Sequence, residues 1–333
     1  MKAYALVSLL LVCGVYGAAI SNEIEGEIDL PKDEVPVISD QMNVDTYDES
    51  EEETRKDLYN RVFFYLYTKA NPTKSQKLIL NDVDALKKSH FDPKKPTMMV
   101  THGWINSESS SAFRLIRDAY LQHGDYNVIA IDWSTITLRP YIWATKRVVM
   151  VGQYSASMID FLKSQGMDLS QLTLVGHSLG GHVAGLSAYY AKGRVEYVVA
   201  LDPALPEFQS AIKGARVSRD DAKYVAVIHS NAAVFGFEKA IGDIDFYPNG
   251  GAIQSGCITN TCSHSRSYEY FAESINSNKG FEAVKCDSYV NFLKGTCNSN
   301  GKTLMGGLRL NRKIKGTYFL RTNKKTPFAM GSI

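Results

Sequence analysis

The sequence predicts an α/β protein with a mostly parallel central sheet flanked by helices. Short apolar runs alternate along the chain with stretches of helical spacing, and strands that alternate with helices form parallel sheets. The runs are continuously apolar, as expected for strands buried on both faces. The chain of 333 residues is long enough for one large domain or two small ones.

Five apolar runs are expected to form the central strands, and two longer stretches have helical spacing. The strands are expected over residues 97–100, 128–131, 172–175, 195–201 and 224–228, and the helices over 141–162 and 183–191. No internal repeat is visible. In parallel sheets of this kind the functional groups lie beyond the carboxyl ends of the strands, so those ends are where site residues are sought.

The composition is that of an ordinary globular protein. Apolar residues make up 44% and charged residues 22%, close to the average, which excludes collagen-like, low-complexity and mainly disordered proteins. The net charge of +2 conceals an asymmetry. Residues 1–56 hold 4 of the 37 basic and 13 of the 35 acidic side chains, so residues 57–333 carry 33 basic and 22 acidic ones, a net charge of +11.

The first residues predict export. Met1-Lys2 precedes an apolar run over residues 3–16 and the small residues 17–19, which is typical of a secretory signal peptide. The run is too short to span a membrane. We therefore expect residues 1–17 to be a signal peptide, and the protein to be secreted and extracellular without a transmembrane segment. The alternative is a buried N-terminal helix.

Residues 18–56 are predicted to be an acidic segment without fixed structure. Between residues 23 and 53 there are 13 acidic residues and one lysine, with too few apolar residues to offset the entropy of ordering. The segment is either a solvated tail or a propeptide that shields the basic domain and is cut near Arg55-Lys56. The folded domain is then expected over residues 57–333.

Four cysteines follow the predicted signal peptide. An even number suits an oxidising compartment, and of the three possible pairings the two nearest-neighbour bridges, Cys257–Cys262 and Cys286–Cys297, are favoured. No C-x-x-C zinc pattern is present, so metal binding through these thiols is less favoured. The sequence contains no N-glycosylation sequon.

The main functional signal follows the expected strand at 172–175. Residues 176–180 read G-H-S-L-G, the G-x-S-x-G pattern of a strand-to-helix turn so tight that the flanking positions need glycine. Such a turn lifts the Ser178 hydroxyl clear of the sheet and points the next helix N-terminus at it. The alternative is a purely structural turn, but the strand before it and the helix after it favour a nucleophile.

A serine hydroxyl is a weak nucleophile until a base takes its proton. On such turns the acid and then the histidine follow the serine in the chain. Asp202 comes 24 residues after Ser178, at the end of the next expected strand, where an orienting acid belongs. Asp132 also ends a strand but precedes the serine, and Asp243 and Asp245 are poorer candidates.

Two histidines after Asp202 could supply the base. His229 ends the expected strand at 224–228, and His264 lies beside Cys262 in an expected loop. The expected disulfide favours His264 as the base, because a cross-linked loop would restrict the motion of its imidazole. The residues alone do not exclude His229 as the base. Three other histidines are expected near the serine, and a structural role is favoured for each of them over a role as the base. They are His102, His177 and His182.

Acyl transfer also requires hydrogen-bond donors for the negative charge that develops on oxygen, typically worth a few kcal/mol each. One donor is expected to be the Leu179 backbone N–H, directly after the serine. The other is expected from the loop after the strand at 97–100, where Gly103 permits a sharp path and Trp104 offers its N–H. A His-Gly pair taken alone is a weak signal.

Taken together, these motifs resemble the pancreatic lipase family of secreted α/β-hydrolases, most of all its insect members. The resemblance runs from about residue 55 to the C-terminus and rests on T-H-G-W at 101–104, D-W at 132–133, V-G-H-S-L-G at 175–180, L-D-P-A at 201–204, D-F-Y-P-N-G-G at 245–251 and C-S-H-S-R-S-Y at 262–268. It implies an α/β-hydrolase fold, the triad Ser178, Asp202 and His264, and no cofactor. Both expected disulfides match the family's pattern, in which the first brackets the lid.

The chain departs from that family's pattern in its surface loops and its length. Only residues 258–261 lie between the lid cysteines, and so short a cross-linked stretch rises at most roughly 8 Å. The stretch 229–242 also looks short, and short loops in the family accompany phospholipase A1 activity. The chain stops soon after residues 318–320, so neither a C-terminal β-sandwich domain nor a colipase-type partner is expected.

The segment that resembles the family's calcium loop is also altered. It retains Arg216 and Asp221, but Lys213 and Ser218 replace two acidic positions. Calcium prefers several oxygen ligands, so no bound metal is expected.

We therefore expect a secreted serine carboxylic ester hydrolase that acts on lipids, most directly a phospholipase A1. Its partner would be phospholipid or another lipid at a membrane or micelle surface, to which basic residues are attracted. The alternatives are a neutral triacylglycerol lipase or galactolipase, and a catalytically silent lipid-binding or yolk-type protein. Charge alone would also allow nucleic acid, but no motif that reads it is present, so none is expected.

Overall fold

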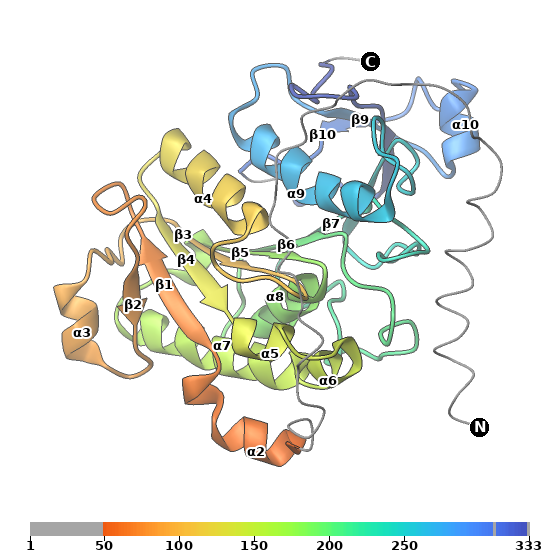
Figure 1. The fold of residues 1–333 in the computed structure, drawn as a ribbon. Helices are drawn as coiled ribbons and strands as arrows, with labels where there is room; N and C mark the ends of the chain where they lie inside the picture. Colours follow the sequence, from red (N-terminus) through yellow and green to blue (C-terminus); the bar gives the residue numbers. More distant parts are fainter. Residues whose placement is uncertain (1–48, 309–310, 332–333) are drawn as a thin grey trace, which may run out of the picture. The chain divides into compact units, whose positions relative to one another are not determined.

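The centre of the protein is an 11-stranded sheet with the strand order β10-β9-β11-β8-β7-β6-β5-β3-β4-β1-β2 (Figure 1). The computed structural model describes residues 49–308 and 311–331. The strands from β11 to β4 in this order run parallel. They are β3 (Thr97–Thr101), β4 (Asn127–Asp132), β5 (Leu172–His177), β6 (Tyr197–Leu201), β7 (Val225–Ile228), β8 (Ile244–Pro248) and β11 (Gly316–Leu320). The five expected strands are β3 to β7, so the predicted α/β fold with a mostly parallel sheet is confirmed.

Antiparallel strands complete the sheet at both edges. On one side β1 pairs with β4 and β2 with β1, and on the other side β9 pairs with β11 and β10 with β9. Their bounds are Phe63–Tyr67 for β1, Gln76–Leu78 for β2, Glu282–Lys285 for β9 and Lys302–Leu304 for β10. Strands β2, β9 and β10 are short and carry polar residues, so no apolar run marked them, whereas the apolar run of β1 was missed.

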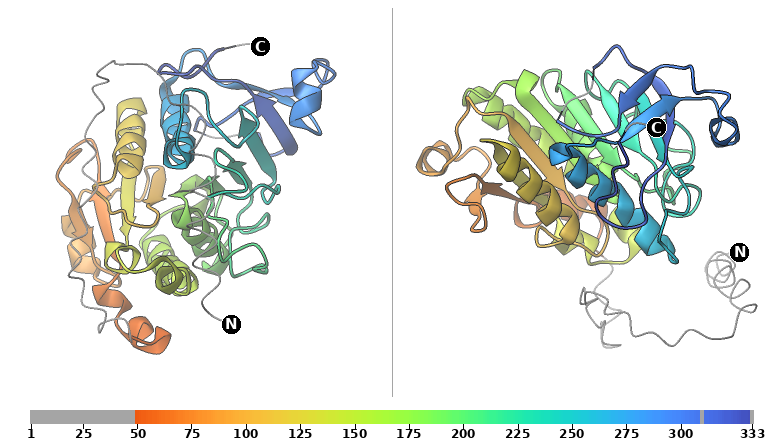
Figure 2. Two further views of the ribbon diagram at one scale, coloured as in Figure 1. Left: turned by 45° about the vertical axis from the view of Figure 1, so that its right-hand side comes forward. Right: turned by 90° about the horizontal axis from the view of Figure 1, so that it is seen from above.

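Helices cover both faces of the sheet. One face packs against α7 (Val148–Ser164) and α8 (Leu179–Tyr190), and the other against α4 (Ser111–His123) and α9 (Asn260–Asn276) (Figures 1 and 2). Met99 belongs to the first core, whereas its neighbours Met98 and Val100 belong to the second. Because both faces are buried, the central strands are continuously apolar.

Helix α7 lies close against α8. A Cβ atom at Gly152 would stand 2.6 Å from the Cβ of Leu186, so only glycine allows this approach. The helical stretch expected over 141–162 is divided into α6 (Tyr141–Thr145) and α7. The shorter helices are α2 (Glu51–Lys56), α3 (Val83–Lys88), α5 (Ser134–Thr137), α10 (Tyr289–Leu293) and the 3-10 turns η2 (Leu58–Asn60) and η3 (Leu169–Gln171).

Both expected disulfides are present. Cys257 bonds to Cys262 and Cys286 to Cys297, with Cα–Cα distances of 5.5 and 5.6 Å. Within residues 49–308 and 311–331, no helix combines the length and the apolar composition needed to cross a membrane.

The end of the acidic segment has a fixed structure, unlike the expectation for residues 18–56. Helix α2 begins after Ser50, whose hydroxyl accepts the N–H of Glu53 at 3.2 Å, while the Glu53 carboxylate accepts the N–H of Ser50 at 2.8 Å. This reciprocal pair satisfies two of the N–H groups left over at a helix start. Residues 1–48, with the expected signal peptide and most of the acidic segment, lie outside the described residues.

A buried arginine explains why this part is ordered. Arg147 is 2% exposed and donates to Thr54 Oγ1 at 2.9 Å, to the Glu49 carbonyl at 2.6 Å and to the Trp143 carbonyl at 3.0 Å. Its guanidinium also lies 3.4 Å from the centre of the Trp143 ring. A buried cation needs such partners, so residues 49–54 complete the surroundings of α7.

Replacing Arg147 by methionine is expected to release α2 from α7. Hydrogen bonds to a charged group are worth about 1.5–3 kcal/mol each, and Thr54 and the Glu49 carbonyl would lose their donor. We expect trypsin to cut native Arg147→Met at least about tenfold faster after Arg55 and Lys56, as measured by mass spectrometry. The control is Arg194→Met, since that exposed guanidinium donates, among the described residues, only to the Ala222 carbonyl. Equal cleavage rates would show that Arg147 does not hold α2.

Candidate active site

The carboxyl ends of three neighbouring strands bring the candidate residues to one edge of the sheet. In the parallel register, Thr101 of β3 pairs with Gly176 of β5, and His177 of β5 pairs with Leu201 of β6. The residues that follow these strands therefore emerge side by side. This is the edge at which parallel sheets place their chemistry.

Ser178 occupies a strained turn between β5 and α8. Its φ of 58° and ψ of −124° lie where side chains rarely go and where strain gathers at functional sites. A Cβ atom at Gly176 would stand 2.0 Å from the Gly180 carbonyl oxygen, and one at Gly180 would stand 2.5 Å from the His102 carbonyl oxygen. The two glycines of the motif are therefore required by close backbone approach.

Asp202 follows β6 and is fully buried, with a φ of 44°. Its Oδ1 accepts the backbone N–H groups of Ser230 at 2.7 Å and Asn231 at 3.0 Å. Its Oδ2 lies 2.5 Å from His264 Nδ1. The carboxylate is thus held by two amides and faces the imidazole with its second oxygen, an arrangement that fixes the orientation and tautomer of the ring.

Gly236 leaves room for this carboxylate. A Cβ atom at Gly236 would stand 2.2 Å from Asp202 Oδ1. The loop is closed by the Gly236 N–H, which donates to the Asn231 carbonyl at 3.0 Å, and by the Phe237 N–H, which donates to the Pro203 carbonyl at 3.0 Å. Our sequence reasoning missed Ser230, Asn231 and Gly236, because no local motif marks them and only the tertiary structure brings them to Asp202.

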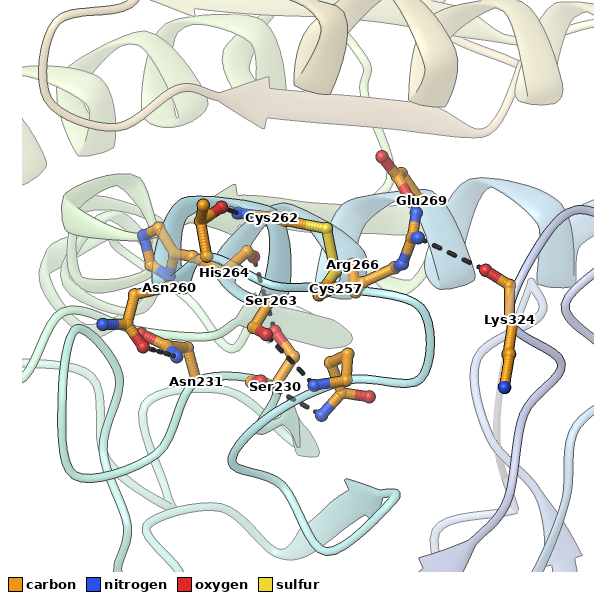
Figure 3. The surroundings of a disulfide bond; sticks show 12 residues. Ser230, Asn231, Cys257, Asn260, Cys262, Ser263, His264, Arg266, Glu269 and Lys324 are labelled. Carbon is orange, nitrogen blue, oxygen red and sulfur yellow. Dashed lines mark hydrogen bonds and ion pairs between the residues drawn. A yellow bond between two sulfur atoms is a disulfide. The ribbon is translucent and has the colours of Figure 1, made fainter. Parts of the chain in front are cut away.

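His264 lies on helix α9 and not in a loop as expected. The Thr259 hydroxyl accepts the N–H of Cys262 at 3.1 Å and caps the helix, which begins at Asn260. The disulfide ties Cys257 to the first turn of α9, just before His264 (Figure 3). Of the four residues between the cysteines, two already belong to the helix, so little free loop remains.

The His264 ring lies against the residue that precedes the serine. The ring centroids of His264 and His177 are 4.4 Å apart, and those of His264 and Phe235 are 5.5 Å apart. His177 Nε2 donates to the His264 carbonyl at 3.1 Å. Burial, and then the nearby His264, lowers the pKa of His177 well below its usual range. His177 is therefore neutral. Among the described residues no hydrogen bond joins Ser178 Oγ to the His264 ring.

The alternative base, His229, is engaged elsewhere. It is fully buried, with Nε2 2.9 Å from Asp245 Oδ1 and Nδ1 2.6 Å from the Phe237 carbonyl. Its ring stacks on Tyr247 at 4.2 Å. With both ring nitrogens occupied, His229 has none left for Ser178, and this geometry favours His264 instead.

His182 and the remaining carboxylates also have structural partners. His182 Nε2 donates to the Ala204 carbonyl at 2.7 Å, and burial lowers the pKa of His182 to about 3. Asp243 accepts the Val225 N–H at 3.0 Å and pairs with Lys315 at 2.8 Å. These interactions explain their burial without a role in chemistry.

His102 and Asp132 shape the loop after β3. His102 Nε2 lies 2.9 Å from Asp132 Oδ1, and its Nδ1 lies 3.0 Å from the Gly103 carbonyl. Burial opposes ionisation of Asp132, but the hydrogen bond and charge of His102, with hydrogen bonds from Ser134, outweigh it and lower the pKa of Asp132. The loop lies in close contact with the serine, since a Cβ atom at Gly103 would stand 2.7 Å from Ser178 Cβ.

Two backbone amides near this loop are unused. Neither the Trp104 N–H nor the Leu179 N–H donates to another described residue. Leu179 is the first residue of α8, where N–H groups have no partner within the helix. The Trp104 indole is anchored by a 2.8 Å bond to the Arg139 carbonyl, and the next residue, Ile105, donates to the Thr137 carbonyl at 3.1 Å. Both amides are available to a ligand oxygen.

The segment that resembles a calcium loop does not fit a divalent cation. Asp221 Oδ2 accepts the Ser218 N–H at 2.7 Å, while the buried Oδ1 has no partner among the described residues. Arg216 donates to Ser218 Oγ at 3.2 Å and, with Lys213, acts on Asp221 by its charge. One buried acidic side chain near two cations, with only the exposed Asp220 acting on it besides, is a poor calcium site. Burial raises the pKa of Asp221 to about 7.

Comparison with known proteins places the chain among the lipases. The model of the family described as Lipase matches residues 33–328. The chain belongs to the pancreatic lipase family. It is 32% identical over 299 residues to the pancreatic triacylglycerol lipase of Oryctolagus cuniculus, covering 80% of this chain and 64% of the relative. It is 33% identical over 260 residues to the inactive pancreatic lipase-related protein 1 of Homo sapiens, covering 70% and 56%.

This family member spans about three fifths of the length of the curated relatives it matches. Among solved structures, it is similar to a phospholipase/carboxylesterase from Dyadobacter fermentans, with 14% identity and a TM-score of 0.32 over 54% of this chain and 79% of the other. The lipase-related protein 1 of Homo sapiens and that of Mus musculus are both named inactive.

Replacing Gly236 by alanine is expected to disturb Asp202 while the fold remains. The new methyl group cannot share the space of the carboxylate, so Asp202 or its loop must move. Small misplacements of such groups cost about 100-fold in rate, and we expect that loss in hydrolysis of a short-chain p-nitrophenyl ester. Gly301→Ala is the matched control, because nothing lies within 4 Å of a Cβ there. Full activity of folded Gly236→Ala would contradict the importance of this cradle.

Replacing Asp221 by asparagine is expected to change how stability depends on pH. The folded-state pKa of about 7 lies above the ordinary value of 3.8, so the stability that Asp221 contributes is present below pH about 4 and is lost as pH rises through about 7. Asparagine does not titrate. The Tm of Asp221→Asn relative to the parent should therefore rise between pH about 4 and pH about 8. The control is Asp84→Asn at an exposed position of α3, away from Asp221, and a flat difference for Asp221→Asn would refute the assignment.

Proposed function

We propose that the protein is a serine carboxylic ester hydrolase that acts on lipids. The observation that carries this proposal is the juxtaposition of a strained Ser178 with the His264–Asp202 pair and with two unused backbone amides. Membership of the lipase family supports it. A merely structural turn would not need a buried acid and a histidine from separate connections of the sheet.

In this proposal His264 takes the proton of Ser178, and Ser178 Oγ attacks the carbonyl carbon of the ester. Asp202 holds the Nδ1 proton and stabilises the imidazolium that forms. The N–H groups of Trp104 and Leu179 donate hydrogen bonds to the negatively charged carbonyl oxygen, helped by the N-terminus of α8. His264 then returns the proton to the leaving alcohol, and water releases the fatty acid from the acyl-serine. No cofactor takes part.

The substrate we propose is a phospholipid, cleaved at the sn-1 ester. Only four residues lie between Cys257 and Cys262, and two of them belong to α9, so this stretch cannot fold over a long acyl-chain groove as a large lid would. The excess of basic residues after residue 56 favours anionic lipid surfaces. Triacylglycerol or galactolipid is the second candidate, and the triacylglycerol lipases among the relatives favour the former.

A catalytically silent lipid-binding protein of the yolk type is the alternative outside enzymes. A relative from Homo sapiens that is named inactive supports this alternative. A fluorophosphonate probe that reacts with an activated serine would label the proposed enzyme at Ser178 and leave a silent protein unlabelled.

The proposal includes secretion, with residues 1–17 as signal peptide, residues 18–56 as an acidic prefix and residues 57–333 as the lipase domain. The two disulfides support an oxidising compartment. Neither a colipase-type partner nor nucleic acid belongs to this proposal.

The decisive measurement compares fatty-acid release from sn-1-labelled phosphatidylcholine and from triolein. We expect phosphatidylcholine to be preferred, and Ser178→Ala to lose at least about 1,000-fold in rate with an unchanged Tm. Preference for triolein would replace the phospholipase proposal by the triacylglycerol lipase one. Retained activity of Ser178→Ala would refute the nucleophile itself.

A further inference from the structure

A second histidine–carboxylate pair lies beside the candidate active site. His102 follows β3 and Asp132 ends the neighbouring strand β4, and both side chains are buried. His102 Nε2 lies 2.9 Å from Asp132 Oδ1 and 3.2 Å from the backbone nitrogen of Trp133. The ring also stacks on Trp133, with the two centroids 5.9 Å apart. The pair is thus held on several sides, yet no step of the proposed hydrolysis uses it.

The other ring nitrogen of His102 bonds the peptide group that joins Gly103 to Trp104. His102 Nδ1 lies 3.0 Å from the Gly103 carbonyl oxygen, and because a carbonyl only accepts hydrogen bonds, Nδ1 carries the proton. The Trp104 N–H belongs to the same peptide group, which is trans. In a trans peptide the C=O and the N–H point in opposite directions. The bond from His102 therefore fixes the direction of the Trp104 N–H.

The direction of this N–H matters because the peptide lies next to the serine. A Cβ atom at Gly103 would stand 3.3 Å from Ser178 Oγ. The chain beyond Trp104 is anchored separately, since the Ile105 N–H donates to the Thr137 carbonyl at 3.1 Å. An ester carbonyl attacked by Ser178 can accept the Trp104 N–H only while the peptide keeps this direction.

We propose that His102 is a positioning residue that aims and polarises the Trp104 N–H toward the oxygen that becomes negative when Ser178 attacks. A hydrogen bond to the C=O of a peptide strengthens donation by the N–H of the same peptide. Asp132 holds the ring so that Nδ1 faces Gly103. His102 itself does not touch the substrate, and no proton moves to or from it. The inference rests on the proposed ester hydrolysis and names the group that sets one of its two oxyanion donors.

Two substitutions separate the two nitrogens of His102. The side-chain nitrogen of asparagine can stand where Nδ1 stands, whereas that of glutamine reaches the position of Nε2. His102→Asn therefore keeps the bond to Gly103, and His102→Gln keeps only the contact with Asp132. We expect kcat for p-nitrophenyl butyrate to fall about 100-fold in His102→Gln with a nearly unchanged KM. In His102→Asn it should stay within about tenfold of the parent value.

A substrate with sulfur in place of the carbonyl oxygen shows whether the oxyanion donor is the part that fails. Sulfur accepts hydrogen bonds weakly, so an enzyme with both donors in place prefers the oxygen ester to its thionoester. The ratio of the two kcat/KM values should fall at least about tenfold in His102→Gln and be retained in His102→Asn. Because the amount of folded enzyme cancels in this ratio, a loss of stability alone leaves it unchanged.

His229 provides the matched control, because it forms the same kind of buried pair. Its Nε2 lies 2.9 Å from Asp245 Oδ1 and its Nδ1 lies 2.6 Å from the Phe237 carbonyl oxygen, whose peptide carries neither of the proposed oxyanion donors. His229→Gln should lower the Tm as His102→Gln does and leave the ratio unchanged.

A second test variant, Asp132→Asn, keeps the shape of the side chain and leaves His102 intact. It removes the charge beside Nε2 and so loosens the ring. The ratio of the two kcat/KM values should fall at least about threefold.

The proposal is overturned if His102→Gln and Asp132→Asn keep the parent ratio, or if His102→Asn loses it as fully as His102→Gln does. A fall in His229→Gln would also overturn it, since the effect would then follow the loss of any buried pair. Failure of the proposed function looks different. The parent chain would then release no p-nitrophenol from either ester, and a fluorophosphonate probe would not label Ser178.

Discussion

The close backbone contact around Ser178 is the constraint on which the candidate site depends. Three glycines allow it. Gly176 lets the chain turn against the carbonyl of Gly180, Gly180 lets α8 meet the loop after β3, and Gly103 lets that loop touch the serine. Any side chain at these positions would push two strand ends apart. Because these segments touch, the hydroxyl, the unused amides and the helix N-terminus share one small volume, and the strained backbone of Ser178 is retained by its surroundings.

The acid and the histidine are fixed by different means on the neighbouring connections. Asp202 is held by two amides and by the space that Gly236 leaves. His264 is held by the start of α9, which a cap and a disulfide fasten to the preceding loop. The two arrangements meet in the Asp202–His264 contact and in the bonds from Ser230 to the His264 carbonyl and from Asn231 to Asn260, so the orientation of the imidazole depends on both. The rigid histidine also lies beside Phe235, which is 40% exposed.

The central sheet and the serine could be predicted from the sequence because their signals are local. Continuous apolar runs marked β3 to β7, and the glycine spacing marked Ser178. The choice between His229 and His264 was left open by the residues, since both follow Asp202, and only the burial of His229 against Asp245 separates them. The amides of the Asp202 cradle could not be predicted, because loop closure alone brings them there. Helix α2 was missed because composition does not show that a buried Arg147 lies 93 residues away in the chain.

The edges of the sheet limit how readily molecules of this protein associate at high concentration. Both outer strands are three residues long, and each carries an exposed lysine, Lys77 in β2 and Lys302 in β10. Short, charged edges offer a poor template for adding a strand from another molecule. The parallel strands, which are apolar enough to aggregate if uncovered, all lie inside these edges. Molecules at high concentration can therefore remain separate, without joining sheet to sheet into fibrils.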